Sequence, residues 1–233
     1  MIRVASYNIR KAIGLDRRRD PERTLTVLKE LNADVIALQE ADRRFGSRAA
    51  AIPPLLLRDF SDYRAVELDT RPDSIGWHGN AIIVREHVVV EATGAFDLPT
   101  LEPRGAVFAD CDFGGGRRWR IVAMHLDLSG IRRRQQVRAI LHQIADKAEP
   151  LPTVLMGDLN EWSIHGGCLR EFGPDYRVLA PGRSFHTRRP VAQLDRIIVS
   201  HALTATGCGV HHSPMSARAS DHLPVWAELL PSS

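Results

Sequence analysis

The sequence predicts a layered α/β fold in which β-sheets pack face to face and helices cover their outer sides. Roughly ten short apolar segments have the length and residue types of strands, and two or three longer segments have helical spacing. The chain has 233 residues, 44% of them hydrophobic, which suffices for one sizeable core. No repeat, low-complexity tract or Ser/Pro-rich linker divides it. We therefore expect a single domain spanning residues 1–233.

Two helices are predicted from capping residues and from the spacing of apolar side chains. One covers residues 131–147, where apolar residues have helical spacing and two prolines follow, at Pro150 and Pro152. The other begins at residues 20–22, where the sequence Asp-Pro-Glu supplies an N-cap, a proline for the first turn and an acidic residue. Three leucines at helical spacing follow it, at Leu25, Leu28 and Leu31.

Strands are predicted where short apolar runs are bounded by polar or turn-forming residues. The run DVIALQ at residues 34–39 predicts a strand buried on both faces, and the three glycines at 114–116 predict a hairpin. The stretch 46–76 leaves two interpretations open, a substrate-facing insertion or a helix followed by a connecting strand. The predicted strands are residues 1–9, 34–39, 80–85, 87–92, 104–112, 118–125, 153–156, 194–200, 202–210 and 223–230.

Cysteine usage and hydropathy exclude several classes of protein. Cys111, Cys168 and Cys208 lie far apart without CxxC spacing, which argues against a disulfide framework and against a thiolate metal site. The amino terminus lacks the apolar stretch of a signal peptide, and no apolar run approaches the roughly 18 residues that span a bilayer. We therefore expect a cytoplasmic protein without a transmembrane segment.

Arginines are clustered although the net charge is only +3. Such clusters can bind an anionic substrate or surface, and they are also common on solvated loops and helices. Trp77, Trp119 and Trp162 lie near predicted strand ends, where a tryptophan can flank a site, although a buried core position is the commoner fate of each. The arginine clusters are at residues 17–19, 43–44, 117–118, 132–134 and 188–189.

The most informative pattern is a series of polar residues at the ends of predicted strands. Taken alone, an aspartate after a strand is usually a turn former or a cap, and a lone histidine is usually a surface residue or a hydrogen-bonded core residue. Ligand sites in layered α/β folds gather at strand ends, however, and two carboxylates about 4 Å apart there repel by about 4 kcal/mol. A bound cation removes this cost, and oxygen-rich donors suit Mg²⁺ or Mn²⁺ better than zinc. The residues are Asn8, Glu40, His125, Asp158, Asn160, Asp195, Asp221 and His222.

Six short motifs that contain these residues resemble those of the endonuclease/exonuclease/phosphatase superfamily, and they occur in the same order. The resemblance implies the DNase I-like fold, a four-layered α/β sandwich of two packed, mainly antiparallel β-sheets flanked by helices. It also implies a divalent-metal-dependent hydrolase that cleaves phosphoester bonds by in-line attack of water, with Mg²⁺ or Mn²⁺ as cofactor. The motifs are SYNIR (6–10), LQE (38–40), MHLD (124–127), GDLN (157–160), LDRIIVS (194–200) and SDHLPV (220–225).

The resemblance implies that three of these residues bind the metal and two act on water and phosphate. Glu40 would be the principal metal ligand, with Asn8 and Asp221 beside it. Asp158 would orient or deprotonate the attacking water, and Asn160 would donate a hydrogen bond to the phosphoryl oxygens.

The remaining roles involve the substrate. His222 would contact the phosphate as acid or base, held in its tautomer by Asp195, and His125 would make a second phosphate contact. This agrees with residue chemistry, since an imidazole paired with a carboxylate has its charged form favoured. Asn80 and Arg104 resemble positions from which relatives reach toward substrate, and their alternatives are a turn-forming asparagine and an ordinary surface arginine.

The substrate class is less sharply defined. The MHLD segment with His125 is similar to that of sphingomyelinase-like, inositol-phosphate and deadenylase members, which favours a small or lipid-derived phosphoester. An endonuclease or exonuclease on DNA or RNA is the alternative, a catalytically idle binding module is a third, and no protein partner is implied. Some DNA-repair members have an acidic residue at the position of Arg10, so their fuller acidic metal site is in doubt here.

Overall fold

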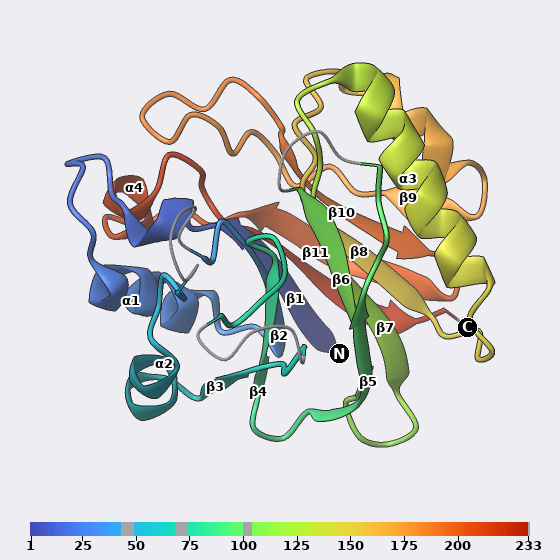
Figure 1. Ribbon diagram of the computed structural model, residues 1–233, viewed down its shortest axis with the longest axis horizontal. Helices are drawn as coiled ribbons and strands as arrows, with labels where there is room; N and C mark the ends of the chain where they lie inside the picture. Colours follow the sequence, from blue (N-terminus) through green and yellow to red (C-terminus); the bar gives the residue numbers. More distant parts are fainter. Residues whose placement is uncertain (43–48, 69–73, 100–103, 233) are drawn as a thin grey trace.

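Two six-stranded β-sheets face each other in the computed structural model, with helices on their outer sides (Figure 1). The structure describes residues 1–42, 49–68, 74–99 and 104–232. The first sheet has the strand order β11 (Leu203–Val210), β12 (Val225–Pro231), β1 (Ile2–Asn8), β2 (Val35–Gln39), β4 (Ala81–Arg85) and β3 (Tyr63–Ala65). The second has the order β5 (Val89–Ala95), β6 (Gly105–Asp112), β7 (Arg118–His125), β8 (Thr153–Asp158), β10 (Asp195–Ser200) and β9 (Tyr176–Val178).

Each sheet is antiparallel except for one parallel pair near its middle. β1 runs parallel to β2 in the first sheet, with Asn8 opposite Gln39, and β7 runs parallel to β8 in the second, with His125 opposite Asp158. Parallel neighbours end at the same edge of a sheet and need a crossover connection, usually a helix. Because Asn8 also hydrogen-bonds Asp158, the carboxyl ends of both pairs lie at the same end of the sandwich.

The two crossover helices are α1 (Pro21–Leu31) and α3 (Gly130–Ala145), and each packs on the outer face of its own sheet. The Asp20 carboxylate caps α1 by accepting the backbone N–H of Arg23 at 2.9 Å. In the described part of the chain, no helix is long and apolar enough to cross a membrane. The remaining helical segments are η1 (Arg10–Ala12), α2 (Pro54–Phe60), η2 (Gly167–Phe172) and α4 (Ser216–Ala219).

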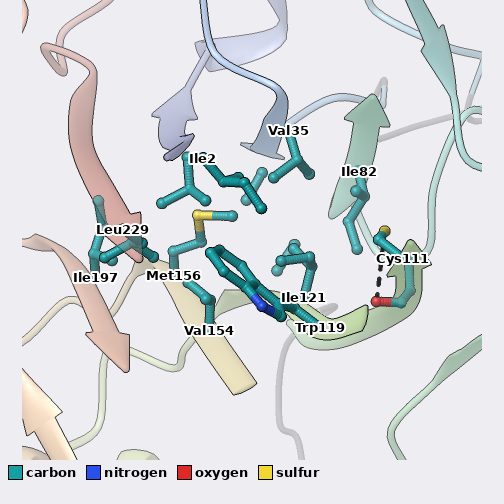
Figure 2. Close-up of a cluster of buried hydrophobic side chains, with 14 of the residues drawn as sticks. Ile2, Val35, Ile82, Cys111, Trp119, Ile121, Val154, Met156, Ile197 and Leu229 are labelled. Atoms are coloured by element: carbon teal, nitrogen blue, oxygen red, sulfur yellow. Dashed lines mark hydrogen bonds between the residues drawn. The ribbon is translucent and has the colours of Figure 1, made fainter. Parts of the chain in front are cut away.

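The space between the sheets is filled by buried apolar side chains from both of them (Figure 2). Ile2, Val35 and Leu229 come from the first sheet, and Trp119 and Met156 come from the second. Burying one such side chain stabilises the fold by about 1.5–3 kcal/mol. Separate apolar clusters lie under α1 and under α3. The order helix, sheet, sheet, helix confirms the predicted four-layered sandwich.

The predicted strands and helices are present at nearby bounds, and the structure adds two strands. β3 and β9 are three-residue edge strands, too short for an alternating pattern to be visible in the sequence. In the described part of residues 46–76, α2 is followed by β3, so the interpretation as a helix followed by a connecting strand is confirmed there. The arginine cluster at 43–44 lies outside the described residues.

Candidate active site

The ends of strands from both sheets meet in one polar cluster. Asn8 ends β1 and Asp158 ends β8, and the side-chain amide of Asn8 donates a hydrogen bond to Oδ2 of Asp158 at 3.0 Å. His125 ends β7 beside Asp158, and its Nε2 lies 3.4 Å from the same oxygen. Gly157 permits this close pairing of β7 and β8, because a Cβ atom there would overlap the carbonyl group of Met124. The cluster is therefore centred on Asp158.

His222 and Asp195 complete the cluster from the last third of the chain. Nδ1 of His222 lies 2.8 Å from Oδ2 of Asp195, and Nε2 of His222 lies 3.7 Å from Oδ2 of Asp158. The Ser184 hydroxyl donates a hydrogen bond to the same Asp195 oxygen. Asp158, Asp195 and His222 are all buried, and one ligand atom of each lies within 4.8 Å of the others. The imidazole is therefore fixed in orientation between two carboxylates.

These two carboxylates hold the His222 ring in its charged form. Burial alone would lower the pKa of His222, but the negative charges of Asp195 and Asp158 raise that pKa to about 10. Burial likewise opposes ionisation of Asp158, yet the His222 charge and a hydrogen bond from His125 hold the pKa of Asp158 well below its usual range. At neutral pH the cluster therefore contains an imidazolium beside an ionised aspartate.

Glu40 and Asp221 each contact a cationic side chain from the segment that follows β1. The Lys11 ammonium forms an ion pair with Glu40, and Nε of Arg10 lies 3.4 Å from Oδ2 of Asp221. Burial favours the neutral form of Glu40, but the hydrogen bond and charge of Lys11 lower its pKa below the ordinary value. Glu40 is thus ionised, and both carboxylates that the sequence predicts as metal ligands lie against a cationic side chain.

Several residues of the site have a left-handed backbone conformation, which is costly for residues other than glycine. The φ angle is +53° at Glu40, +47° at Arg10, +59° at Lys11 and +49° at Asn160. Each such residue costs about 1–3 kcal/mol. The Lys11 N–H donates to the Glu40 carbonyl, and the Asn160 N–H donates to Oδ1 of Asp158, both at 3.0 Å. These bonds hold the strained backbone in place at the strand ends, which is typical of a functional site.

Asn80 and Arg104 approach the cluster from the starts of β4 and β6. The Asn80 amide donates to the carbonyl of Gly105 at 3.0 Å, and Gly105 pairs with His125 in the second sheet. A guanidinium nitrogen of Arg104 lies 2.8 Å from Nδ1 of His125. Every predicted site residue therefore lies at this end of the sandwich, with Asn80 at the edge of the cluster.

The sequence profile of the Endonuclease/Exonuclease/phosphatase family matches residues 5–222. The chain belongs to this family. The match extends from the first strand through His222, so it includes every predicted site residue. No curated protein matches the chain significantly.

Three solved structures illustrate the fold that this member of the Endonuclease/Exonuclease/phosphatase family shares with known proteins. A family protein from Bacteroides vulgatus has a TM-score of 0.77 at 18% identity, over 99% of both chains. A mannosyl-6-phosphatase from Bacteroides thetaiotaomicron has a TM-score of 0.74 at 20% identity, over 99% of this chain and 100% of the other. The human nocturnin catalytic domain, with a bound sulfate anion, has a TM-score of 0.73 at 20% identity, over 99% of this chain and 94% of the other.

Three further residues belong to the cluster around Asp158, although the sequence analysis did not identify them as site residues. Lys11 follows the SYNIR motif by one residue and pairs with Glu40. Ser184 bonds Asp195, and the Phe185 ring packs on His222 with ring centroids 4.8 Å apart. Ser184 and Phe185 lie in an irregular segment that matches no motif, so only the position of Lys11 next to a motif could have indicated its role.

A divalent cation, as expected for the Endonuclease/Exonuclease/phosphatase family, suits the donor atoms at this end of the sandwich. Glu40, Asn8 and Asp221 offer carboxylate and amide oxygens, the hard ligands that Mg²⁺ and Mn²⁺ prefer. The two carboxylates, Glu40 and Asp221, already attract cationic side chains. The residues present therefore fit a hard dication.

Proposed function

We propose that the chain is a Mg²⁺- or Mn²⁺-dependent hydrolase that cleaves a phosphoester bond of a small or lipid-derived substrate by in-line attack of water. The observation that carries this proposal is an ionised Asp158 facing a His222 imidazolium, which Asp195 holds at 2.8 Å. Asp158 can accept a hydrogen bond from water, while His222 presents a proton to the phosphoryl group. Both groups needed for hydrolysis are therefore available in one cluster.

Glu40, Asn8 and Asp221 would hold the metal ion. When bound, the ion would neutralise the non-bridging phosphoryl oxygens and stabilise the leaving group. Asp158, Asp195 and His222 also lie close enough together to bind an ion, but the Asp195–His222 hydrogen bond already uses two of their ligand atoms. We therefore assign the metal to the carboxylates that border the cluster, and not to its centre.

Asp158 orients the attacking water in this proposal. Its lowered pKa keeps it ionised, which makes it a good hydrogen-bond acceptor but a weak base. The side-chain amide of Asn160 is fixed beside it by a hydrogen bond to the carbonyl of Leu126 at 2.9 Å, and its second N–H is left for a phosphoryl oxygen.

The substrate phosphate would lie between His222 and the His125–Arg104 pair. His222 donates a proton to the leaving oxygen from Nε2, because Asp195 holds Nδ1. The Arg104 guanidinium has the planar donor geometry that suits phosphate oxygens, and Asn80 would bind substrate at the edge of the cluster.

A nuclease that acts on DNA or RNA is the second candidate. Trp162 is exposed and lies edge-on to Phe185, with ring centroids 6.2 Å apart. An exposed aromatic ring is typical of proteins that stack bases. Its binding would weaken steeply with salt. A catalytically idle binding module is disfavoured, because every polar position of the motifs is retained.

Hydrolysis of bis-p-nitrophenyl phosphate tests the proposal. Turnover should require added Mg²⁺ or Mn²⁺ and stop with EDTA, and Asp158→Asn and His222→Ala should each lower kcat by about 10²–10⁴-fold. Asp62→Asn is the matched control, since that side chain is 80% exposed and lies outside the cluster. Full activity in either site variant would overturn the assigned roles. A panel of nucleic acids, phospholipid head groups and inositol phosphates separates the two candidates.

A further inference from the structure

Large apolar side chains are exposed on three segments beside the candidate active site. We call these segments, residues 128–135, 162–167 and 182–193, the rim. Figure 1 shows the start of α3 and the loop before β10 at the same end of the molecule. The apolar side chains are between 56% and 65% exposed, and clusters of this kind usually mark an interaction site. They are Leu128, Ile131, Trp162, Ile164 and Val191.

The rim has no acidic residue. Its sequences are LSGIRRRQ, WSIHGG and GRSFHTRRPVAQ, which contain six arginines and no aspartate or glutamate. Arg133 is buried in an ion pair with Glu161. Arg134, Arg188 and Arg189 are exposed, and none of them forms an ion pair with another described residue. The surface around the site is therefore apolar and positively charged at once.

Specific contacts join the rim segments to one another. The Arg133 guanidinium donates to the Leu128 carbonyl at 2.7 Å and lies 3.2 Å from Oε2 of Glu161, the residue before Trp162. The Trp162 ring contacts Phe185 of the third segment. The rim is thus a continuous surface and not a set of independent loops.

The rim is also joined to the catalytic cluster. Phe185 contacts both Trp162 and His222, with ring centroids 6.2 Å and 4.8 Å apart. The Val191 N–H donates to the Phe185 carbonyl at 2.7 Å, which fixes this exposed valine beside the same aromatic pair. The rim therefore adjoins His222 through Phe185.

We propose that the rim docks onto an anionic lipid surface and brings a lipid phosphoester to His222; the catalytic part of this inference rests on the proposed function. Exposed aliphatic and tryptophan side chains partition into the interface between head groups and acyl chains. Arginines beside them are attracted to anionic lipids, by about fivefold in affinity for each residue close to the surface.

The alternative partner with matching charge is a nucleic acid, and the apolar side chains argue against it. Single-stranded nucleic acids are bound on aromatic platforms that stack successive bases. Four of the five exposed apolar residues of the rim are aliphatic, and Trp162 is the exception. Aliphatic side chains offer no stacking face, whereas a lipid surface buries them as well as it buries tryptophan.

Vesicle co-sedimentation tests the docking surface without catalysis. The full chain would be mixed, in EDTA, with vesicles of phosphatidylcholine and phosphatidylserine or of phosphatidylcholine alone, and with single-stranded DNA in a parallel assay. We expect at least tenfold tighter binding to the anionic vesicles. Arg188→Glu combined with Arg189→Glu should weaken that binding by about 25-fold or more, and Ile131→Ser combined with Ile164→Ser by about tenfold.

Matched control variants lie on other surfaces. Arg177→Glu reverses the charge of one exposed arginine on β9, at the end of β10 remote from Asp195, and Leu55→Ser removes an exposed leucine of α2. Both should bind the vesicles like the wild type. All of these variants should hydrolyse soluble bis-p-nitrophenyl phosphate at the wild-type rate, because none of the changed residues touches the catalytic cluster.

The outcomes separate the docking surface from the proposed function. Vesicle binding that is lost in the rim variants and retained in the controls supports docking. If soluble phosphodiester is then not turned over, only the proposed function fails. Equal binding to both kinds of vesicle, or equal loss in the controls, overturns docking whatever the turnover. Binding of single-stranded DNA but not of anionic vesicles overturns it in favour of a nucleic acid.

Discussion

Asp158 ends β8 and Glu161 follows three residues later, and both are buried, but their partners differ in kind. Glu161 accepts backbone N–H groups from Ser163 and Cys168 at 3.0 Å and pairs with the Arg133 guanidinium at 3.2 Å. Asp158 faces the imidazoles of His125 and His222 at 3.4 Å and 3.7 Å. In both cases the partners lower the pKa of the carboxyl against the effect of burial.

The difference separates a structural carboxylate from a chemical one. Backbone amides and a guanidinium keep their protons at any ordinary pH, so they can hold the Glu161 loop but cannot take part in proton transfer. An imidazole can give up a proton and take it back, so a histidine that faces Asp158 can take part in proton transfer. Burial and charge alone therefore do not identify a site; the chemistry of the partners does.

Replacing the structural carboxylate should mainly affect stability. Glu161→Gln leaves the buried Arg133 guanidinium without its counter-charge, and we expect the free energy of unfolding to fall by about 3 kcal/mol. Urea denaturation measures this change. The kcat of the folded variant on bis-p-nitrophenyl phosphate should stay within about threefold of wild type, since this carboxylate touches none of the reacting groups. A 10³-fold loss of kcat in a stable variant would show that Glu161 takes part in catalysis.

The pH dependence of stability should also distinguish the two carboxylates. Because the folded pKa of His222 is raised to about 10, its contribution is fully present below the unfolded value near 6.5 and is lost as pH rises toward 10. Between pH 7 and 9 in EDTA, the wild type should lose up to about 1.4 kcal/mol of unfolding free energy per pH unit relative to His222→Gln.

Glu161 should behave in the opposite sense, because its pKa is lowered in the folded protein. Its contribution is present above the unfolded value and is lost as pH falls through the folded pKa, so Glu161→Gln should differ from wild type least in acid. Urea denaturation across the pH range measures both effects. A wild type and a His222→Gln variant with parallel curves on the alkaline side would show that the imidazolium is not held by its carboxylates.

The smallest expected effect concerns the ion pair between Lys11 and Glu40, in which we expect a metal ion to replace Lys11. Lys11 neutralises Glu40 as Arg133 neutralises Glu161, but the Lys11–Glu40 pair is about a quarter exposed. Lys11→Met should free the Glu40 carboxylate and tighten Mg²⁺ binding by about tenfold, measured by calorimetry without substrate. Lys29→Met, at an exposed position of α1, is the control and should leave Mg²⁺ affinity unchanged. Weaker Mg²⁺ binding in Lys11→Met would place the ion away from Glu40.

Much of the site could be predicted because it lies where strands end. Asn8, His125 and Asp158 are each the last residue of a buried strand. Parallel pairing of β7 and β8 brings His125 beside Asp158, and Asn8 hydrogen-bonds Asp158 from the other sheet. Short apolar runs located these strands, and the ordered motifs implied the four-layered sandwich. Local pattern and global fold agree at these positions, which is the condition under which sequence reasoning succeeds.

The residues that could not be predicted depend on long-range contacts of irregular backbone. Phe185 meets His222 through an isolated β-bridge, and Ser184 reaches Asp195 from a loop without periodicity. Lys11, which pairs with Glu40, has a left-handed backbone, a conformation that the sequence gives no reason to expect for lysine. Trp119 has the buried position expected for it, whereas Trp162 is exposed next to Phe185.

Hydrolysis of bis-p-nitrophenyl phosphate in ¹⁸O-labelled water tests the central claim most directly. With Mg²⁺ or Mn²⁺ present, mass spectrometry should find one ¹⁸O atom in the p-nitrophenyl phosphate product and none in the p-nitrophenol, because the water oriented by Asp158 attacks phosphorus. Label in the p-nitrophenol, or label in the phosphate at an undiminished rate in Asp158→Asn, would contradict the account.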